Sequence, residues 1–573
     1  MHINRCVWAA AAALVGVVTV LVSAPARLSA QSGVALSGVV SSDKEGKMEG
    51  VVVSARREGA NYTVSVITGS GGKYSFPTSH VGPGKYAVTT RATGYEQPEA
   101  ASADVLMGKA AKVDVKLVEA QDISKHLTSR EWALSLPEKN DMLEKAVFNI
   151  ESCVYCHSLE RIFRTKYTAE QLVPAITRML KYYPDGSVMG TAGRGRTVMK
   201  TKEEQERAEK SPNWWEYSPS GGPIPKKELA EFIAKYNLSG GRTKYPYDFV
   251  RLPRAKGTGG KTIVTTWDLP RKDTVPHDSQ TDSKGNLWYT DESAMWIGKL
   301  NPKTNEITEY QMPPVEKGDI PGVRDITIDG QDNLWFTMRL PGSKSVLHKW
   351  EPATQKLTQI EGTAGQFVAV SKDGKKVWVG FQRADTTTAK LDGDFRRPAN
   401  LPQGKNMGAY GLDIDPKGNP WGTSFMTGEI MGVDVAKGEA LIYPVAGGTN
   451  AVPRRGRVDA KGRFWFSFYG KEALGMFDTN TRTFKEWKIG PRFSTPYTSS
   501  TPDPKERVYL PSNTCDCFFR VDTKSGQVLE FAMPAPVNSF DAKRVSWDPT
   551  SKVPALMFAN TRNAQLVRME VLD

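Results

Sequence analysis

The chain has 573 residues, enough for several domains of ordinary size. Charged residues make up 24% and hydrophobic residues 39%, which excludes a disordered chain, and the 51 glycines, 36 prolines and 14 tryptophans favour strands and turns over a helical protein. The net charge of +13 is spread without a run of five like charges, so the sequence predicts no nucleic-acid partner and leaves anionic ligands or acidic proteins as partners.

Residues 1–30 have the features of an export signal. Arg5 precedes an apolar run over residues 7–22, and Leu-Ser-Ala at 28–30 is typical of a signal-peptidase site. The run is shorter than the roughly 20 residues that span a bilayer. We therefore expect cleavage near Ala30, a periplasmic or secreted protein, and no integral membrane segment after cleavage.

Residues 33–121 contain short stretches of alternating apolar and polar residues separated by glycine-rich turns, the pattern of a small β-sandwich. Three motifs resemble the carboxypeptidase regulatory-like domain: Gly-Gly-Lys-Tyr at 71–74, Pro-Gly-Lys-Tyr at 83–86 and Ala-Thr-Gly-Tyr at 92–95. The resemblance implies a prealbumin-like fold without catalytic residues. We expect a spacer or docking module.

The strongest motif is Cys-Val-Tyr-Cys-His at residues 153–157, which predicts attachment of one c-type haem. Cys153 and Cys156 lie one helical turn apart and would form thioethers with the two vinyl groups, while His157 would bind the iron axially. A redox dithiol and half of a zinc site are the alternatives. Zinc would need two more ligands, and outside the motif no Cys or His lies between residues 127 and 276.

Residues 122–240 around the motif have helical periodicity, with expected helices from Thr168 through residue 180 and over 225–236. The motif and the segment that follows it resemble the single-haem, class I-like cytochrome c domains attached to certain bacterial dehydrogenases. Because no second histidine follows residue 126 in this domain, a methionine is the natural sixth iron ligand. The resemblance favours Met179, ordinary class I spacing favours Met199, and Met189 lies between them.

Residues 261–573 repeat the unit Asp-x-x-Gly-Asn-Leu-Trp-Phe-Thr seven times, the last copy degraded. A period near 44 residues with four strands per unit predicts a seven-bladed β-propeller. The chain ends before the seventh unit has an outer strand, so residues 262–269 should complete that blade. Residues 241–260 form a linker rich in Gly, Lys and Arg, which predicts mutual mobility of the domains. The expected fold is therefore multidomain and mainly β: sandwich, helical cytochrome c domain, propeller.

The repeats resemble the propeller of streptogramin (virginiamycin B) lyase. That resemblance implies a catalytic histidine at the start of an inner strand and nearby acids that hold Mg²⁺. Blade one matches in part through His277, Asp291 and Glu292, which could also hold Ca²⁺. Blade six has no histidine, so lyase chemistry remains an alternative rather than the leading interpretation.

One position near the start of each inner strand should approach the central channel. These positions, with two adjacent arginines, predict a positive funnel for a small anionic ligand. The alternative is that the cations pair with Asp278, Asp325 and Asp541. The funnel residues are His277, Arg324, Phe367, Tyr410, Arg454, Thr498 and Lys543, with Arg455 and Arg544 beside them.

Cys515 and Cys517 fall on a hairpin at the same rim. A local disulfide, a soft-metal site and a thiol pair are the alternatives, and an oxidising compartment favours the disulfide. The leading functional hypothesis is a periplasmic monohaem cytochrome that exchanges electrons with a redox partner protein, coupled to oxidation or binding of an anionic ligand by the propeller. The alternatives are a Mg²⁺-dependent C–O lyase and a non-catalytic binding or adhesion module. Whether the chain is an enzyme stays open.

Overall fold

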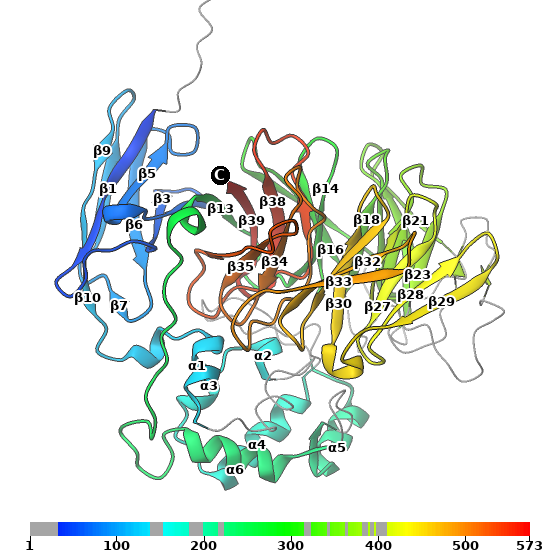
Figure 1. The fold of residues 1–573 in the computed structure, drawn as a ribbon, viewed down its shortest axis with the longest axis horizontal. Coiled ribbons are helices and arrows are strands. Elements are labelled where there is room, and N and C mark those ends of the chain that lie inside the picture. The colour runs from blue at the N-terminus through cyan, green and yellow to red at the C-terminus, as the bar shows by residue number, and fades with distance from the viewer. Residues whose placement is uncertain are drawn as a thin grey trace, which may run out of the picture.

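A computed structural model of the protein describes residues 33–137, 153–182, 199–215, 223–313, 322–340, 344–360, 365–380, 388–389, 395–396 and 410–572. They form three parts: an N-terminal β-sandwich, a ring of seven β-sheet blades, and a small helical domain along one face of the ring (Figure 1). Among the described helices, none is both long and apolar enough to cross a membrane.

The N-terminal part is the expected β-sandwich. Its inward-facing residues, such as Leu36, Val53 and Phe76, form one buried core. One sheet has the order β2-β1-β10-β7, with β5 and β9 also paired to β1, and the other contains β4-β3-β6-β8. The strands are β1 (Val34–Ser42), β2 (Gly46–Lys47), β3 (Val52–Arg57), β4 (Tyr62–Ile67), β5 (Lys73–Pro77), β6 (Gly84–Arg91), β7 (Tyr95–Glu96), β8 (Ala101–Val105), β9 (Ala111–Lys112) and β10 (Val115–Glu119).

The ring has seven blades, as the repeat predicted, and the paired strands within each blade are antiparallel. They follow chain order except in blade seven, whose outer strand comes from residues 262–268. Among the described residues of blade three, the two strand pairs form separate sheets, and blade six shows three strands. The strands are β14 (Pro276–Thr281), β15 (Leu287–Asp291), β16 (Trp296–Asn301), β17 (Glu306–Gln311); β18 (Val323–Ile328), β19 (Leu334–Leu340), β20 (Lys344–Glu351), β21 (Lys356–Gln359); β22 (Phe367–Val370), β23 (Val377–Gly380), β24 (Thr388–Ala389), β25 (Phe395–Arg396); β26 (Tyr410–Ile414), β27 (Pro420–Ser424), β28 (Glu429–Asp434), β29 (Glu439–Pro444); β30 (Pro453–Val458), β31 (Arg463–Phe468), β32 (Ala473–Asp478), β33 (Thr483–Lys488); β34 (Arg507–Ser512), β35 (Cys517–Asp522), β36 (Val528–Ala532); and β37 (Val545–Trp547), β38 (Ala555–Asn560), β39 (Gln565–Val571).

The same set of hydrogen bonds around the repeat aspartate recurs in each regular blade and explains the sequence repeat. One carboxylate oxygen of the repeat aspartate accepts the backbone N–H groups two and four residues later, as Asp415 does from Lys417 and Asn419. The other oxygen accepts the indole N–H of the repeat tryptophan, at 2.9 Å between Asp415 and Trp421. The same bond joins Asp282, Asp329 and Asp459 to their tryptophans at 2.9–3.0 Å. Each of these indoles is therefore buried with its N–H group hydrogen-bonded.

Closure of the ring is confirmed as predicted. Strand β13 (Thr262–Asp268) pairs along its whole length with β39 and so completes blade seven. Its other edge pairs with β4 of the sandwich, which joins both domains into one eight-stranded sheet (Figure 1). The mutual mobility predicted from the linker is therefore wrong for sandwich and propeller. The composition of residues 241–260 indicates a flexible segment. It does not indicate whether the sheet edges of the sandwich and the propeller pair with each other.

The third part is a small helical domain. Thr168 caps the expected helix through a capping box with Gln171. The core of the domain includes Trp132, Phe163 and Leu229. Its elements are α1 (Ser129–Ser135), α2 (Cys153–Cys156), α3 (Glu160–Phe163), α4 (Ala169–Leu180), α5 (Lys202–Lys210), α6 (Lys226–Tyr236), and the short strands β11 (Asn213–Trp215) and β12 (Ile224–Pro225).

Candidate functional site

The helical domain docks on the propeller rim where blades six and seven present their hairpins. Arg130 of α1 is 3% exposed and forms two bonds with Glu530 of β36, at 2.8 and 3.1 Å. Its backbone N–H donates to the carbonyl of Thr514 at 2.8 Å. The side chain of Asn538 accepts the backbone N–H of Ser129 at 2.7 Å. These buried contacts fix the position of the segment that follows.

The Cys-Val-Tyr-Cys-His segment lies at this docked rim. Cys153 begins the helical turn α2, and the carbonyl of the buried Val154 accepts a hydrogen bond from the propeller residue Arg562. His157 is half-buried, its Nδ1 lies 3.1 Å from the carbonyl oxygen of Ser158, and desolvation lowers its pKa to about 4. A neutral ring whose Nδ1–H donates to that carbonyl keeps the lone pair on Nε2. This arrangement fits an axial iron ligand.

The three candidate methionines have different surroundings. Met179 is half-buried on α4, on the same face as the core residues Leu172 and Ile176. Met199 is 45% exposed, and its backbone forms an isolated bridge with Tyr182. Met189 lies outside the described residues.

The funnel residues converge and are buried, and the titratable ones among them have partners within the protein. In one group, Glu292 holds both His277 and Arg324: its carboxylate lies 3.4 Å from Nε2 of His277 and 2.8 Å from Arg324. The other ring nitrogen of His277 faces Asp278 at 2.9 Å. Asp291 points to a different partner, Arg271, at 2.8 Å. The two acids proposed as metal ligands are therefore both ion-paired, and no three metal-binding side chains converge within the described residues.

The second group is an aromatic box around Arg454. Its guanidinium lies 4.0 Å from the ring centre of Tyr497 and 4.8 Å from that of Tyr410, and it donates to the Tyr410 hydroxyl at 2.9 Å. The two tyrosine hydroxyls bond each other, and burial raises the pKa of both. Lys543 lies 4.1 Å from the Tyr497 ring and pairs with Asp541 at 2.8 Å. Tyr497 was missed because position counting selected its neighbour Thr498.

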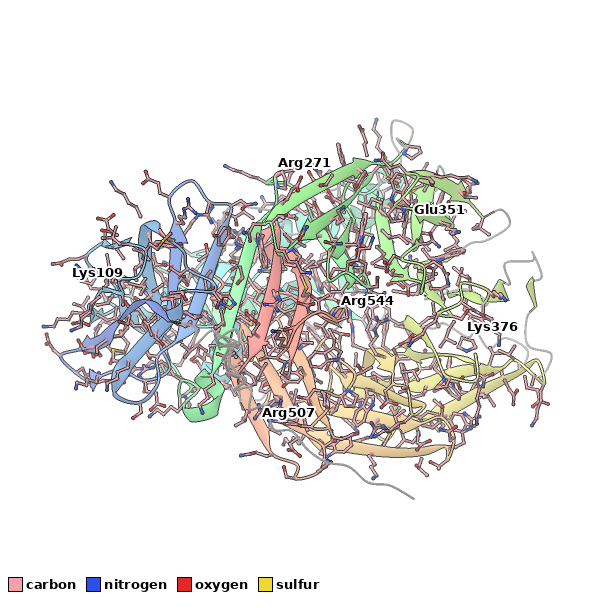
Figure 2. The ribbon with its side chains drawn as sticks, turned by 90° about the horizontal axis from the view of Figure 1, so that it is seen from above. Lys109, Arg271, Glu351, Lys376, Arg507 and Arg544 are labelled. Carbon is pink, nitrogen blue, oxygen red and sulfur yellow. A yellow bond between two sulfur atoms is a disulfide. The ribbon has the colours of Figure 1, made fainter. Side chains whose placement is uncertain are left out.

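The third group lies in the middle of the channel. Arg455 pairs with Asp278, and Arg544 pairs with Asp325 at 2.8 Å. Figure 2 shows Arg544 near the centre of the ring of blades. Although burial acts in the opposite direction, the Arg455 guanidinium and the hydrogen bond with His277 hold the pKa of Asp278 well below its usual range. The cations thus have the aspartate partners that the alternative interpretation named.

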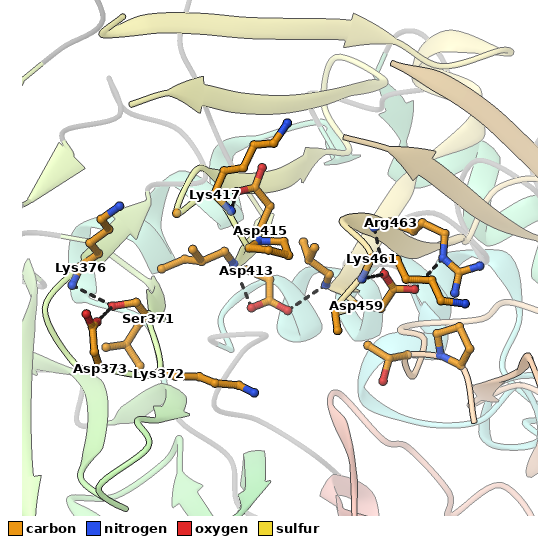
Figure 3. Close-up of a pocket in the computed structure, with 18 of the residues that line it drawn as sticks. Ser371, Lys372, Asp373, Lys376, Asp413, Asp415, Lys417, Asp459, Lys461 and Arg463 are labelled. Carbon is orange, nitrogen blue, oxygen red and sulfur yellow. Dashed lines mark hydrogen bonds and ion pairs between the residues drawn. The ribbon is translucent and has the colours of Figure 1, made fainter. Parts of the chain in front are cut away.

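An open pocket of about 900 Å³ lies at the other mouth, where the inner strands of blades three to six end. Its lining includes Lys372, Lys376 and Lys417 together with the repeat aspartates Asp415 and Asp459 (Figure 3). The aspartates are occupied by their own turns and by Trp421 and Trp465. The sequence predicted a ligand site at the opposite mouth, where His277 and Arg324 lie, and did not identify this pocket.

Cys515 and Cys517 form a disulfide, as expected, in the hairpin between β34 and β35. The residue between them, Asp516, accepts the backbone N–H of Asn538 and pairs with Arg91 of the sandwich at 3.3 Å. The hairpin therefore links the propeller to both other domains.

Comparisons with known proteins agree with the N-terminal assignment. Residues 35–118 match the carboxypeptidase regulatory-like domain. The structure is similar to virginiamycin B lyase from Staphylococcus aureus (15% identity, TM-score 0.46, covering 54% of this chain and 100% of that one) and to a streptogramin B lyase (14%, 0.47, 55% and 100%). It is also similar to YCF48 bound to a D1 peptide (11%, 0.41, 54% and 95%). A search of curated proteins found no match.

Proposed function

We propose that this protein is an exported monohaem c-type cytochrome, with its haem held by the helical domain at the mouth of the propeller. The observation that carries the proposal is the geometry of His157. Its Nδ1 faces a backbone carbonyl and its Nε2 is left for iron, directly after the helical turn that bears Cys153 and Cys156. A bound haem supplies a one-electron couple between ferric and ferrous iron.

The residues of this chain would hold and orient that group. Cys153 and Cys156 would form the thioethers, His157 one axial bond and Met179 the other. Met179 is preferred over Met199 because it lies on the buried face of α4, whereas Met199 is 45% exposed. A thioether sulfur suits haem iron and leaves the core apolar.

The propeller would bind a small anionic ligand or dock the redox partner protein. The support is the open pocket, where Lys372, Lys376 and Lys417 have no carboxylate within ion-pair distance among the described residues. The lining also carries acids, Asp373, Asp413 and Asp503 among them, so an anion would bind through direct contact with these ammonium groups rather than through a net positive field. The lyase alternative is weaker, because His277, Asp291 and Glu292 are occupied by one another and by arginines.

The test is expression with export and haem maturation, followed by visible spectra of the protein after denaturation and solvent extraction. The expected result is a reduced c-type α-band that stays with the polypeptide. A Cys153→Ser/Cys156→Ser variant should lose it, and the matched pair Cys515→Ser/Cys517→Ser should keep it. A wild-type protein without covalent haem would disprove the proposal.

A further inference from the structure

We infer that Ser129 of the helical domain is a positioning residue for the haem ligand His157, and that Asn538 of the propeller orients the Ser129 hydroxyl. The inference rests on the proposed function. It concerns a chain of hydrogen bonds that runs from the propeller to the imidazole ring through one peptide group, the one that joins Ser158 to Leu159.

This peptide group makes a contact at each of its two polar ends. Its carbonyl oxygen, which belongs to Ser158, lies 3.1 Å from Nδ1 of His157. Its N–H group, which belongs to Leu159, donates to Oγ of Ser129 at 3.2 Å. Ser129 and Leu159 are both fully buried, so solvent does not compete for the N–H bond. Because a peptide group is planar, Ser129 fixes the orientation of the carbonyl that His157 meets.

The other end of the chain is Asn538, in the segment between β36 and β37. The Ser129 hydroxyl donates to Oδ1 of Asn538 at 3.0 Å, and Nδ2 of Asn538 donates to the carbonyl of Leu127 at 2.9 Å. The backbone N–H of Asn538 donates to the buried Asp516 at 2.6 Å, which fixes Asn538 to the disulfide hairpin. A hydroxyl has one proton, and Asn538 accepts it, so the Ser129 oxygen presents its lone pairs to Leu159.

The chain should affect the iron through the His157 ring. Consecutive hydrogen bonds polarise one another, so the bond from the Leu159 N–H makes the Ser158 carbonyl a stronger acceptor. A stronger acceptor at Nδ1–H makes the imidazole a more basic ligand. A more basic ligand favours ferric over ferrous iron, because the ferric ion carries one more positive charge. Loss of the Ser129 hydroxyl should therefore raise the reduction potential.

The experiment compares haem-loaded, full-length variants with wild type by spectroscopic redox titration. Ser129→Ala should favour the reduced state about twofold, which raises the one-electron potential by about 18 mV. Hydrogen exchange at the Leu159 amide should rise in the same variant, because that N–H has lost its acceptor.

Ser135→Ala is the matched control. Ser135 is also buried in α1, and its hydroxyl likewise donates to a carbonyl, that of Glu131 at 2.7 Å. It also accepts a backbone N–H, from Val250 at 2.8 Å, but this bond leads to the segment before the propeller rather than to His157. The control should match wild type in potential and in exchange at Leu159.

Asn538→Ala separates the positioning of His157 from a general loss of docking. It removes three bonds between the propeller and the helical domain, but the Ser129 oxygen can still accept from Leu159. Its potential should therefore lie between those of wild type and Ser129→Ala. A potential at or above that of Ser129→Ala would show that docking sets the value, and would overturn the inference.

The remaining outcomes are equally decisive. Equal potentials for wild type and a fully loaded Ser129→Ala protein would overturn the inference while leaving the proposed function intact. If Ser129→Ala does not fold, equal potentials for Asn538→Ala and Ser135→Ala would overturn it. Absence of covalent haem from wild type would instead disprove the proposed function.

Discussion

Blade five and blade seven have the same four-stranded sheet but are assembled from different parts of the chain. Strands β30 to β33 of blade five follow one another over residues 453–488, and each pairs with the strand before it. Blade seven takes three strands from residues 545–571 and the fourth, β13, from residues 262–268. The paired residues Asp268 and Gln565 are 297 positions apart.

Because of this difference, the two blades should differ in how far a destabilising substitution affects the rest of the molecule. Contacts within blade five are local, so forming them costs little chain entropy. Contacts of blade seven close the ring, and β13 also carries the sandwich on its other edge. Damage to blade five should stay within a blade, whereas damage to β13 should reach the ring and the sandwich together.

The largest effect is expected from a proline in β13. Thr265 pairs with Arg568 on one side and with Val64 on the other, so its backbone N–H bonds to one neighbour whichever way it points. Thr265→Pro removes that bond from a central strand and should cost of order 3 kcal/mol or more. Chemical denaturation should show sandwich and propeller destabilised together.

The control is Lys488→Pro in β33, the edge strand of blade five. Ile489 donates its N–H to Glu472, and hydrogen-bonded pairs alternate along an antiparallel ladder, so the N–H of Lys488 points away from β32. The variant should cost much less. Equal losses of stability for Thr265→Pro and Lys488→Pro would show that the two blades do not differ.

A smaller effect is expected where the helical domain joins blades six and seven. Arg130→Ala removes two charge-assisted bonds to Glu530 and one to Ser494, with an expected loss of about 2–3 kcal/mol in docking. Amide hydrogen exchange should rise in α1 while the strands of blade five stay protected. Lys471→Ala, which breaks a half-exposed pair with Glu486 on the same rim of blade five, should leave α1 unchanged. Unchanged exchange in the Arg130→Ala protein would contradict this docking role.

In blades built from consecutive strands, replacing the repeat aspartate should lower the free energy of unfolding, and the size of the loss should depend on its bond to the tryptophan. Asp415→Ala leaves Trp421 and two backbone N–H groups without an acceptor, so we expect a loss of about 1–3 kcal/mol in the free energy of unfolding. Blade three supplies the control. Asp373 is exposed, and the indole N–H of Trp378 has no partner among the described residues, so Asp373→Ala should cost less than about 1 kcal/mol. Equal costs would show that the indole bond contributes nothing.

The same contrast explains what could be predicted from the sequence. The aspartate–tryptophan pair recurs in the chain, so it predicted the blades, and the strand-like segment before the first repeat unit predicted closure by β13. The pairing of β4 with β13 has no local signature, because an edge strand has the same alternating pattern whether or not it has a partner. The carbonyl contact of Arg562 was missed for a related reason: it depends on where two distant domains meet.

The smallest effect concerns a contact between neighbouring blades, which is local in sequence but not within one sheet. Hydrogen bonds from Arg463 and Lys461 of blade five lower the pKa of Glu506 at blade six from 4.5 to about 2. Because the pKa is lowered in the folded state, this stabilisation is present above about pH 4.5 and is lost as the pH falls towards 2. The pair is partly exposed, so we expect about 1 kcal/mol.

Glu506→Gln should therefore be less stable than wild type at pH 7, and the difference should disappear near pH 2. Glu439→Gln, at an exposed position in β29, serves as the control and should give no such pH-dependent difference. If the Glu506→Gln difference persisted at pH 2, packing rather than charge would join blades five and six. The link between these consecutive blades would then resemble the apolar packing inside each sheet, and the contrast with blade seven would rest on strand closure alone.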